Sequence, residues 1–398
     1  MPPTEPTPTS GIRPRRHLSR LLPVVVAGAG LVLLAGAALR TPGPSPSSAP
    51  QVMHSPTRWT TPTTTATVAP ILGAAYNVTD YGARADGVTD DRGAIAAAAR
   101  AAVAAGGHVS FPPGTYRLTG TLSALPGAYY YAPAGATLRT QDDIFVPSGC
   151  TFDGLTFQSY GASTALSIGM KSNGTPRLAT GVTVKNCSFV EGTAEYTHAR
   201  VLLYLAQGCT VDHNTFTGTA GSGGNIQLLG GSSNHITNNT ISGGTTAILS
   251  MWSRSSNGGG LASIIKDNVI TGNTYSGYSE EGISFDLKAS DGSDCGALEY
   301  DTVAAVSGQD ITLSNLAYPN YVGYDIVFVD GNLRDRTRTI TAESGHTFTV
   351  SGSLAGVAVG DHVTIGACYK DNYVAYNTGT SAAGSDPFSA VLLYVAGA

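Results

Sequence analysis

The fold is decided by a nine-residue stretch that the chain uses twice. It reads Lys266-Asp267-Asn268-Val269-Ile270-Thr271-Gly272-Asn273-Thr274 and returns as Lys370-Asp371-Asn372-Tyr373-Val374-Ala375-Tyr376-Asn377-Thr378. Part of it belongs to a shorter pattern, an apolar residue followed by another five positions later. That pattern occurs at 152–157, 184–189, 211–216, 236–241 and 265–270, with starts 32, 27, 25 and 29 residues apart. A repeat of this length predicts the coils of a parallel β-solenoid.

An asparagine stands at the third step of the last three copies, as Asn214, Asn239 and Asn268. We expect these residues to share one coil position, where asparagine tolerates a left-handed turn and bonds along the stack. A second series of short apolar strands lies between the copies, at 201–205, 225–229, 247–251, 282–286 and 391–395. The alternative is a β-sandwich with an accidental period.

Composition supports a turn-rich β protein. Glycine contributes 50 of 398 residues and charged residues only 12%, which excludes a helical bundle or coiled coil. The hydrophobic share of 42% is sufficient for a core. We expect an all-β solenoid over residues 71–290, a small β-domain inserted at 291–366, and a last part of the solenoid over 367–398.

The N-terminus predicts export. Four arginines (Arg13, Arg15, Arg16 and Arg20) precede an uncharged run of 19 residues, 21–39, which is long enough to span a bilayer. Residues 1–40 are therefore either a cleaved signal peptide or a membrane anchor, and residues 41–70 form a linker rich in Pro, Ser and Thr. We expect a protein that is secreted or held at the outer face of the membrane, with no other membrane contact.

Charge and cysteine content limit which binding partners and which kinds of site we expect. Residues 71–398 carry a net charge of −10 with no basic run, so a nucleic-acid partner is not expected. No Cys-x-x-Cys occurs, which argues against zinc. The five cysteines leave at least one unpaired, and Cys295 with Cys368 could close the base of the insertion. The sequence leaves the oligomeric state open.

Two motifs near the start of the solenoid carry a family resemblance. They read Asn77-Val78-Thr79-Asp80-Tyr81-Gly82-Ala83-Arg84-Ala85-Asp86-Gly87-Val88-Thr89-Asp90-Asp91 and Gly106-Gly107-His108-Val109-Ser110-Phe111-Pro112-Pro113-Gly114-Thr115-Tyr116. This region resembles the opening of pectate-lyase-3 type proteins, a group with polysaccharide lyases, polygalacturonase-like hydrolases, rhamnogalacturonase and epimerase relatives and phage tailspikes. The resemblance implies a right-handed parallel β-helix.

Between the motifs, residues 91–105 predict an N-terminal helix that covers the open end of the solenoid. Thr89 or Asp90 would cap the helix and Gly106-Gly107 would end it. We therefore assign Asp86, Asp90 and Asp91 to capping and not to catalysis. The Asn-Thr-Asp, Gly-His-Gly and Arg-x-Lys set of polygalacturonases is absent from the coils, as are the Trp-x-Asp-His and Arg-x-Pro-x-x-Arg patterns of pectate lyases. The fold carries over, but substrate and catalytic residues do not.

Candidate site residues follow from strand alternation. In 282–288, Ile283, Phe285 and Leu287 should fill the core, so Ser284, Asp286 and Lys288 face outward, together with Glu280. Aligning the other coils adds further residues to this outer face: Arg200, Tyr204, Gln227, Ser250, Trp252, Arg254 and Tyr394.

The chemistry of this face suggests catalysis on a sugar polymer. Glu280, Glu281 and Asp286 could supply a general acid and base for hydrolysis. Lys288 or Arg254 could instead neutralise a uronate carboxylate or abstract a proton in a lyase. The substrate would be held by the rings of Trp252 and Tyr204 and by Arg200 and Gln227, with His198 as a further candidate. The alternative without a catalytic role is that these acids form a solvated face.

We expect no obligatory cofactor, although the Asp-rich loop 286–294 could bind Ca²⁺. The predicted function is cleavage of an extracellular polysaccharide by a lyase or a hydrolase. The alternatives are a non-catalytic carbohydrate-binding or adhesion protein and a sugar epimerase. The last strand copies 201–205 and would be followed by another coil, so we expect either a truncated product or a partner at that end.

Overall fold

The computed structural model describes residues 73–161, 164–192, 199–218, 224–251, 264–286, 299–316, 320–366, 369–381 and 389–394. The side chains of residues 251, 286, 381 and 389–394 are outside this description. The predicted export segment and linker, together with Cys295 and Cys368, therefore lie outside the described residues.

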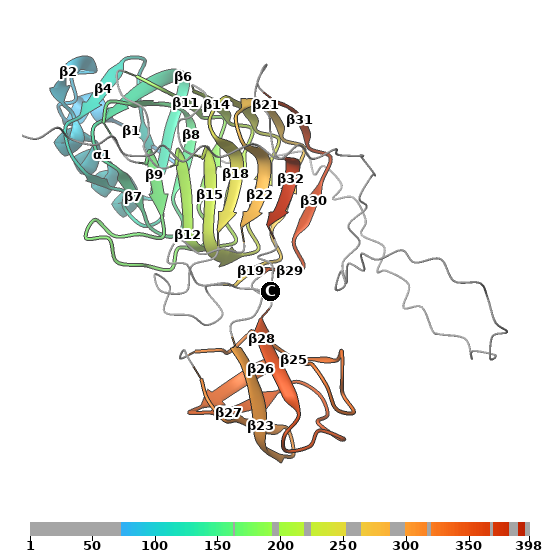
Figure 1. Cartoon of the computed structure of the whole chain (residues 1–398). Helices are drawn as coiled ribbons and strands as arrows, with labels where there is room; N and C mark the ends of the chain where they lie inside the picture. Colours follow the sequence, from blue (N-terminus) through green and yellow to red (C-terminus); the bar gives the residue numbers. More distant parts are fainter. Residues whose placement is uncertain are drawn as a thin grey trace, which may run out of the picture. The chain divides into compact units, whose positions relative to one another are not determined.

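The chain winds into parallel coils, each adding one strand to each of three stacks (Figure 1). Val184, Val211, Ile236, Ile270 and Val374 are successive neighbours in the first stack. The parallel β-helix predicted from the repeat is confirmed. Ile270 and Val374 are adjacent although 104 residues separate them, so the chain between them leaves the coils and returns.

The first stack consists of β8 (Thr151–Ser159), β10 (Thr183–Lys185), β13 (Thr210–Asp212), β16 (His235–Thr237), β20 (Val269–Thr271) and β30 (Tyr373–Ala375). The second contains the end of β8 with β11 (Ser188–Val190), β14 (Thr215–Thr217), β17 (Thr240–Ser242), β21 (Thr274–Tyr278) and β31 (Thr378–Ser381). The third stack runs through β5 (Leu122–Ser123), β7 (Ile144–Val146), β9 (Leu166–Ile168), β12 (Val201–Gln207), β15 (Ile226–Ser232), β18 (Thr246–Met251), β22 (Glu281–Asp286) and β32 (Ser389–Tyr394), and β15 also pairs with β19 (Ile265–Lys266), which pairs with β29 (Tyr369–Lys370).

Inward side chains of successive coils stack directly on one another. The rings of Phe157 and Phe189 lie 5.0 Å apart and those of Phe189 and Phe216 lie 4.6 Å apart, both pairs nearly parallel. All three rings are fully buried, and burying each one contributes about 2 kcal/mol. This apolar column is what the five-residue spacing of the repeat encodes.

Two asparagine ladders line the turns before and after the strands of the first stack. In one ladder, Nδ2 of Asn214 donates to Oδ1 of Asn239 at 3.0 Å, and Asn239 donates to Asn273 at 2.9 Å. The other ladder joins Asn234, Asn268 and Asn372. Bonding along the stack is thus confirmed.

The position of Asn268 needs a correction. It belongs to the second ladder, and Asn273 takes the place expected for it, because Ile236 pairs with Ile270 and not with Ile265. The two ladders stand five residues apart on one coil, so the same short pattern fits both registers. The left-handed conformation falls on the residue before the ladder asparagine, with φ of 53° at His213 and 54° at Asn238.

Cysteines occupy the head of each ladder. The backbone N–H of Cys187 donates to Oδ1 of Asn214, and that of Cys209 donates to Oδ1 of Asn234. Cys150, Cys187 and Cys209 are all buried free thiols. Burial raises the pKa of Cys150 and of Cys187 to about 12 and also raises the pKa of Cys209.

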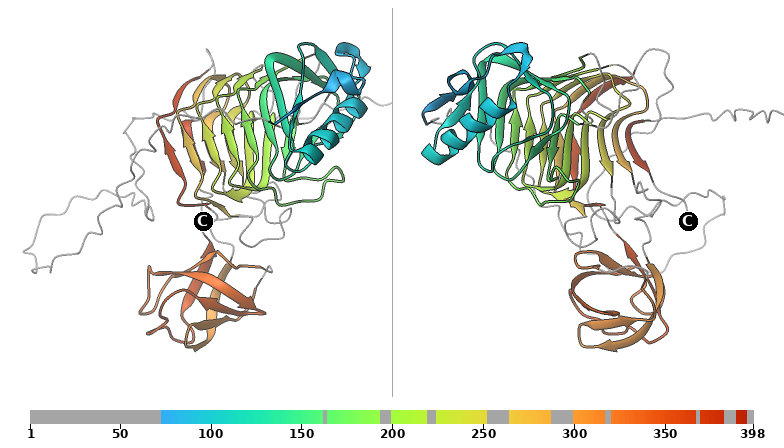
Figure 2. Two further views of the ribbon diagram at one scale, coloured as in Figure 1. Left: turned by 180° about the vertical axis from the view of Figure 1, so that it is seen from behind. Right: turned by 90° about the vertical axis from the view of Figure 1, so that its left-hand side faces the viewer.

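The first coil is built from short elements around one helix. These are β1 (Ala75–Asn77), the 3₁₀ turn η1 (Val78–Tyr81), β2 (Asp86–Asp90), α1 (Arg92–Ala105), β3 (His108–Ser110), β4 (Thr115–Leu118) and β6 (Tyr129–Thr140). Helix α1 lies at the end of the coils where the chain enters them (Figure 2), and its Ile95, Ala98 and Ala102 join the solenoid core. The predicted capping helix is confirmed.

The details of the helix start differ from the prediction. The N-cap is Asp91, one or two residues later than expected, and its carboxylate accepts hydrogen bonds from the backbone N–H groups of Arg84 and Ala85. Asp90 pairs instead with Arg92 at 2.8 Å. The C-cap Gly106 has a φ of 66°, so the predicted glycine stop is confirmed.

A small closed barrel lies between β22 and β29 in the sequence. Its strands follow the order β23 (Glu299–Ser307), β24 (Asp310–Leu313), β27 (Thr347–Val350), β26 (Thr337–Ser344), β25 (Asp325–Phe328) and β28 (His362–Gly366). All neighbours are antiparallel, and Tyr321, Phe328 and Phe348 are buried in the core of the barrel. The barrel falls within the segment 291–366.

Candidate functional site

The candidate site is the outer face of the third stack. Residues in register across its eight strands form one row, which we call the outer row: Ser123, Phe145, Ser167, Leu202, Gln227, Leu249, Ser284 and Leu392. Adjacent members stand about 4.8 Å apart, so the row extends for roughly 34 Å along the solenoid. Because alternate strand residues point to opposite faces, the inward neighbours Ile248 and Ile283 are fully buried.

This face is more apolar and more covered than predicted. Leu202, Tyr204 and Leu205 form a buried cluster with Met170 and Leu229 packed against it. The Tyr204 side chain is 6% exposed and that of Gln227 is also 6% exposed. Both residues lie at outward register positions as expected, but neither is an open platform for a sugar in this structure.

Register also corrects the position of Ser250. It pairs with Phe285 and Leu228, which are core residues, and its own side chain is buried. The outward positions on β18 are those of Leu249 and Met251. The prediction for Ser250 was wrong because the coil alignment was displaced by one residue, which reverses the face of a strand.

Arg200 lies at the edge of the third stack and is 1% exposed, not outward-facing in solvent. Its Nη2 atom lies 2.7 Å from Oε1 of Glu191, and its Nη1 donates to Oδ1 of Asn225 at 2.5 Å. Asn225 in turn donates to the backbone carbonyl of Gly243. A guanidinium engaged in this way holds the coil edge together and is not presented to a polymer.

Two of the candidate acids, Glu281 and Asp286, stand at opposite ends of β22. Glu280 is exposed, whereas Glu281 is half-buried and accepts a hydrogen bond from Oγ1 of Thr246 at 2.9 Å. Asp286 ends the same strand, five residues beyond Glu281, which corresponds to about 16 Å. Glycosidase carboxyl pairs stand about 5–9.5 Å apart, so β22 alone does not bring Glu281 and Asp286 to that distance.

Several predicted residues lie outside the described residues. They are Trp252, Arg254, Lys288 and His198. The same holds for residues 287–294 of the loop proposed for Ca²⁺. Among the residues that are described, no group of three or more His, Cys, Asp or Glu is arranged to hold a metal ion. The side chain of Tyr394 is likewise undescribed, although its backbone pairs with Asp286.

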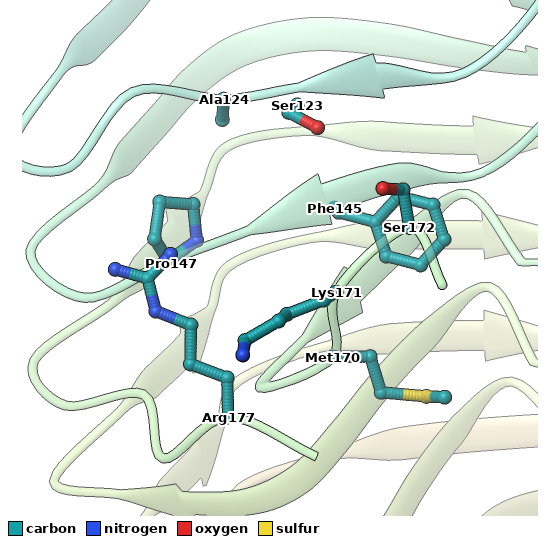
Figure 3. Close-up of a pocket in the computed structure, with 8 residues that line it drawn as sticks. All are labelled: Ser123, Ala124, Phe145, Pro147, Met170, Lys171, Ser172 and Arg177. Carbon is teal, nitrogen blue, oxygen red and sulfur yellow. The ribbon is translucent and has the colours of Figure 1, made fainter. Parts of the chain in front are cut away.

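The described part of the third stack has a pocket at its first coils. This hairpin pocket has a volume of about 230 Å³ and is lined by Ser123, Ala124, Phe145, Pro147, Met170, Lys171, Ser172 and Arg177. Figure 3 shows the Lys171 and Arg177 side chains extending from the loop into the space beside β7, which carries Phe145. Phe145 is half-buried, while Lys171 and Arg177 are exposed.

The loop that carries the two cations is a tight hairpin. Met170 and Pro176 form an antiparallel bridge, and the N–H of Lys171 donates to the carbonyl of Thr175 at 3.0 Å. The N–H of Arg177 donates to the carbonyl of Gly169 at 2.7 Å. Gly169 has a φ of 87°, and a Cβ there would meet the carbonyl oxygen of Tyr204, so only glycine fits.

Sequence reasoning missed this pocket. The available signal was the Asn173-Gly174 pair, a strong hairpin turn, with a basic residue on each leg. Residues 170–180 lie between β9 and β10 and outside the repeated strands, so the coil alignment did not include them. Phe145 was missed because β7 is a three-residue strand outside the repeat.

Comparison with known proteins supports the family resemblance. Residues 75–132 match the family model described as rhamnogalacturonase A/epimerase, pectate lyase-like. This match covers the motifs at 77–116, so the resemblance to pectate-lyase-like proteins is confirmed for that segment. No helix in the described part of the chain is long and apolar enough to cross a bilayer, and the run 21–39 lies outside that part.

Two curated relatives from Azotobacter vinelandii match short stretches. The chain is 62% identical over 45 residues to mannuronan C5-epimerase AlgE6, covering 11% of this chain and 5% of that protein. It is 54% identical over 54 residues to alginate lyase 7, covering 13% and 6%. The chain thus spans about a twentieth of the length of these relatives.

Solved structures with a similar chain path include the Streptococcus pneumoniae surface protein and adhesin PfbA. The TM-score is 0.37 with 18% identity, over 53% of this chain and 64% of that one. The catalytic unit of a GH87 α-1,3-glucanase from Streptomyces thermodiastaticus gives a TM-score of 0.38 with 19% identity, over 55% of this chain and 44% of the other.

Proposed function

We propose that this protein acts on an extracellular polysaccharide, which it binds along the third stack and cleaves. The observation that carries the proposal is the register of the outer row, which continues across eight parallel strands. Ser123, Phe145 and Leu249 are exposed or half-buried, whereas Ser167, Leu202, Gln227 and Ser284 are buried. A face of roughly 34 Å suits an extended polymer better than a compact ligand. A pocket with an aromatic ring and two cations lies at one end of this row, and Glu280 stands on the turn before β22 near the other.

Cleavage has two candidate chemistries. An exposed carboxylate at Glu280, acting with a second acid from outside β22, would support hydrolysis. Proton abstraction by Lys288 or Arg254, with the carboxylate of the sugar neutralised by a cation, would support a lyase. The names of the two curated relatives make the lyase and the epimerase reactions natural candidates beside hydrolysis.

A second candidate is a binding or adhesion protein. The observation that favours it is the backbone separation of Glu281 from Asp286, which stand at opposite ends of β22 and are about 16 Å apart along the strand. The same outer row would then hold a glycan without cleaving it.

The test is to incubate the full-length chain with acidic and neutral polysaccharides and follow two signals together. A rise in both ultraviolet absorbance from unsaturated ends and reducing ends indicates β-elimination. Reducing ends alone indicate hydrolysis, and Glu280→Gln should then abolish the signal while Asp267→Asn, an exposed acid on a first-stack turn, leaves it unchanged. Binding with neither signal supports the adhesion alternative.

The proposed location is outside the cytoplasm, supported by the arginine-flanked run 21–39. Mass analysis of the mature chain tests this, because a cleaved signal removes the first segment whereas an anchor retains it in the membrane fraction.

A further inference from the structure

We propose that the hairpin pocket binds the carboxylate of an acidic sugar unit, as a uronate subsite several coils away from β22. The inference rests on the proposed function, because it assigns one unit of a polymer already placed along the third stack. The pocket lies at the first three strands of that stack, whereas Glu281 begins the seventh and Glu280 directly precedes it.

The two positive charges at the pocket favour the binding of an anion. Lys171 and Arg177 lie diagonally across the hairpin, a position at which side chains come within about 7–8 Å and like charges repel. Neither side chain has a carboxylate partner among the described residues, in a chain whose net charge is negative. An anionic ligand between them would turn this repulsion into attraction.

The carboxylate of Asp143, next to β7, does not neutralise Lys171 and Arg177. Asp143 stands two residues before Phe145, and its Oδ1 accepts a hydrogen bond from the backbone N–H of Thr164 at 2.8 Å. Its Oδ2 accepts a hydrogen bond from the hydroxyl of Ser167 at 3.0 Å. Asp143 therefore fastens β7 to β9 and leaves the two cations uncompensated.

The backbone that carries the two cations is held in place before any ligand arrives. The hairpin is closed by the bonds between Lys171 and Thr175, between Gly174 and Lys171, and between Arg177 and Gly169. The hydroxyl of Thr175 also donates to Oδ1 of Asn173 across the turn. Since little backbone freedom is lost on binding, charge-assisted contacts at this site contribute their energy to affinity.

The wall of the pocket selects a sugar over a bare anion. Phe145 is half-buried and lies in register with Ser123 and Ser167, so its ring sits on the outer row itself. An aromatic ring offers an apolar surface to the face of a pyranose, while a guanidinium presents a planar fork that matches a carboxylate. A uronic acid unit combines both features.

The test measures affinity by calorimetry on the full-length chain. The probes are oligomers of galacturonate and of mannuronate, each beside its carboxyl-reduced counterpart. We expect the wild-type protein to prefer at least one acidic oligomer by about tenfold or more, and the preference to shrink with added salt. The double variant Lys171→Gln with Arg177→Gln should lose that preference and keep its affinity for the reduced oligomer.

Two control variants accompany the double variant. Arg100→Gln removes one positive charge from an exposed position on α1 and should change no affinity. Phe145→Ala should weaken the binding of the acidic and the reduced oligomers alike. If the double variant retains the full preference for the acidic oligomer, the subsite is wrong and the proposed function stands. If the wild-type protein binds none of the four oligomers, the uronate subsite is wrong, and the proposed function is decided separately by its own test on acidic and neutral polysaccharides.

Discussion

The guanidinium of Arg200 and the carboxylate of Glu191 form an ion pair inside the coil edge, with Nη2 and Oε1 2.7 Å apart. The Arg200 side chain is 1% exposed and that of Glu191 is 14% exposed. A residue that sequence alternation places on the outer face thus serves the fold. Its position next to Asn225 links the start of β12 to the coil that follows.

Replacing Arg200 by methionine should therefore destabilise the protein. The variant removes the Arg200 partner of the largely buried Glu191 carboxylate. Breaking such a pair costs about 3 kcal/mol or more. Urea denaturation at pH 7 measures the free energy of unfolding, and Arg100→Met on the exposed face of α1 is the matched control. An Arg200→Met variant with wild-type stability but weaker polysaccharide binding would contradict this assignment.

A substitution in the first asparagine ladder should destabilise the protein to a similar extent. Asn239 donates to Val211 and to Asn273, and accepts from the backbone and side chain of Asn214. Asn239→Ala leaves buried polar groups without partners, which we expect to lower the free energy of unfolding by about 3 kcal/mol. Its neighbour Asn238 is exposed with a φ of 54°, so Asn238→Gly should change stability little. Equal losses in the two variants would refute a specific role for the ladder.

The three buried thiols should resist chemical modification. Because burial raises the pKa of Cys150 and Cys187 to about 12, almost no thiolate exists at pH 8. A maleimide followed by peptide mass mapping should leave Cys150, Cys187 and Cys209 unlabelled in native protein and label them in urea. Rapid labelling of any of the three in the native state would show that the ladder heads open.

The lowered pKa of Asp86 predicts how the stability of the protein changes in acid. Hydrogen bonds from the backbone and hydroxyl of Thr89 and from the N–H of Val88 lower the Asp86 pKa to about 2. Its unfolded value is about 3.9, so its contribution to stability is complete above that pH and is lost as pH falls towards 2. The stability difference between wild type and Asp86→Asn should shrink over this window. A difference that stays constant from pH 7 to pH 2 would rule out the linkage.

The fold was accessible from sequence because a solenoid repeats its packing. Phe157, Phe189 and Phe216 occupy equivalent positions, so one spacing recurs in the chain and predicts the stack. The helix over Arg92–Ala105 was equally visible through its alanines and its glycine stop. The register of the coil around Ile265 could not be predicted from the sequence, since the two ladders offer the same pattern five residues apart.

The site was less accessible, for two physical reasons. A strand's face reverses with each residue, so a one-residue error placed Ser250 outward when Leu249 takes that position. Exposure also depends on what covers a face, which alternation cannot reveal: Tyr204 and Gln227 lie at outward positions and are nevertheless buried. The hairpin from Met170 to Pro176 lies outside the repeated strands, so the repeat did not point to it.

The central claim, that a polysaccharide lies along the outer row, is tested most directly by placing one negative charge on each of two faces. Leu249→Glu introduces it at the middle of the outer row, and His235→Glu introduces it at an exposed outward position of the first stack. Retention of the full-length proteins in native gels containing polygalacturonate or alginate at pH 8 gives the readout. We predict that Leu249→Glu loses retention several-fold while His235→Glu migrates as the wild type does. Equal behaviour of the two variants, or a loss confined to His235→Glu, would contradict the account.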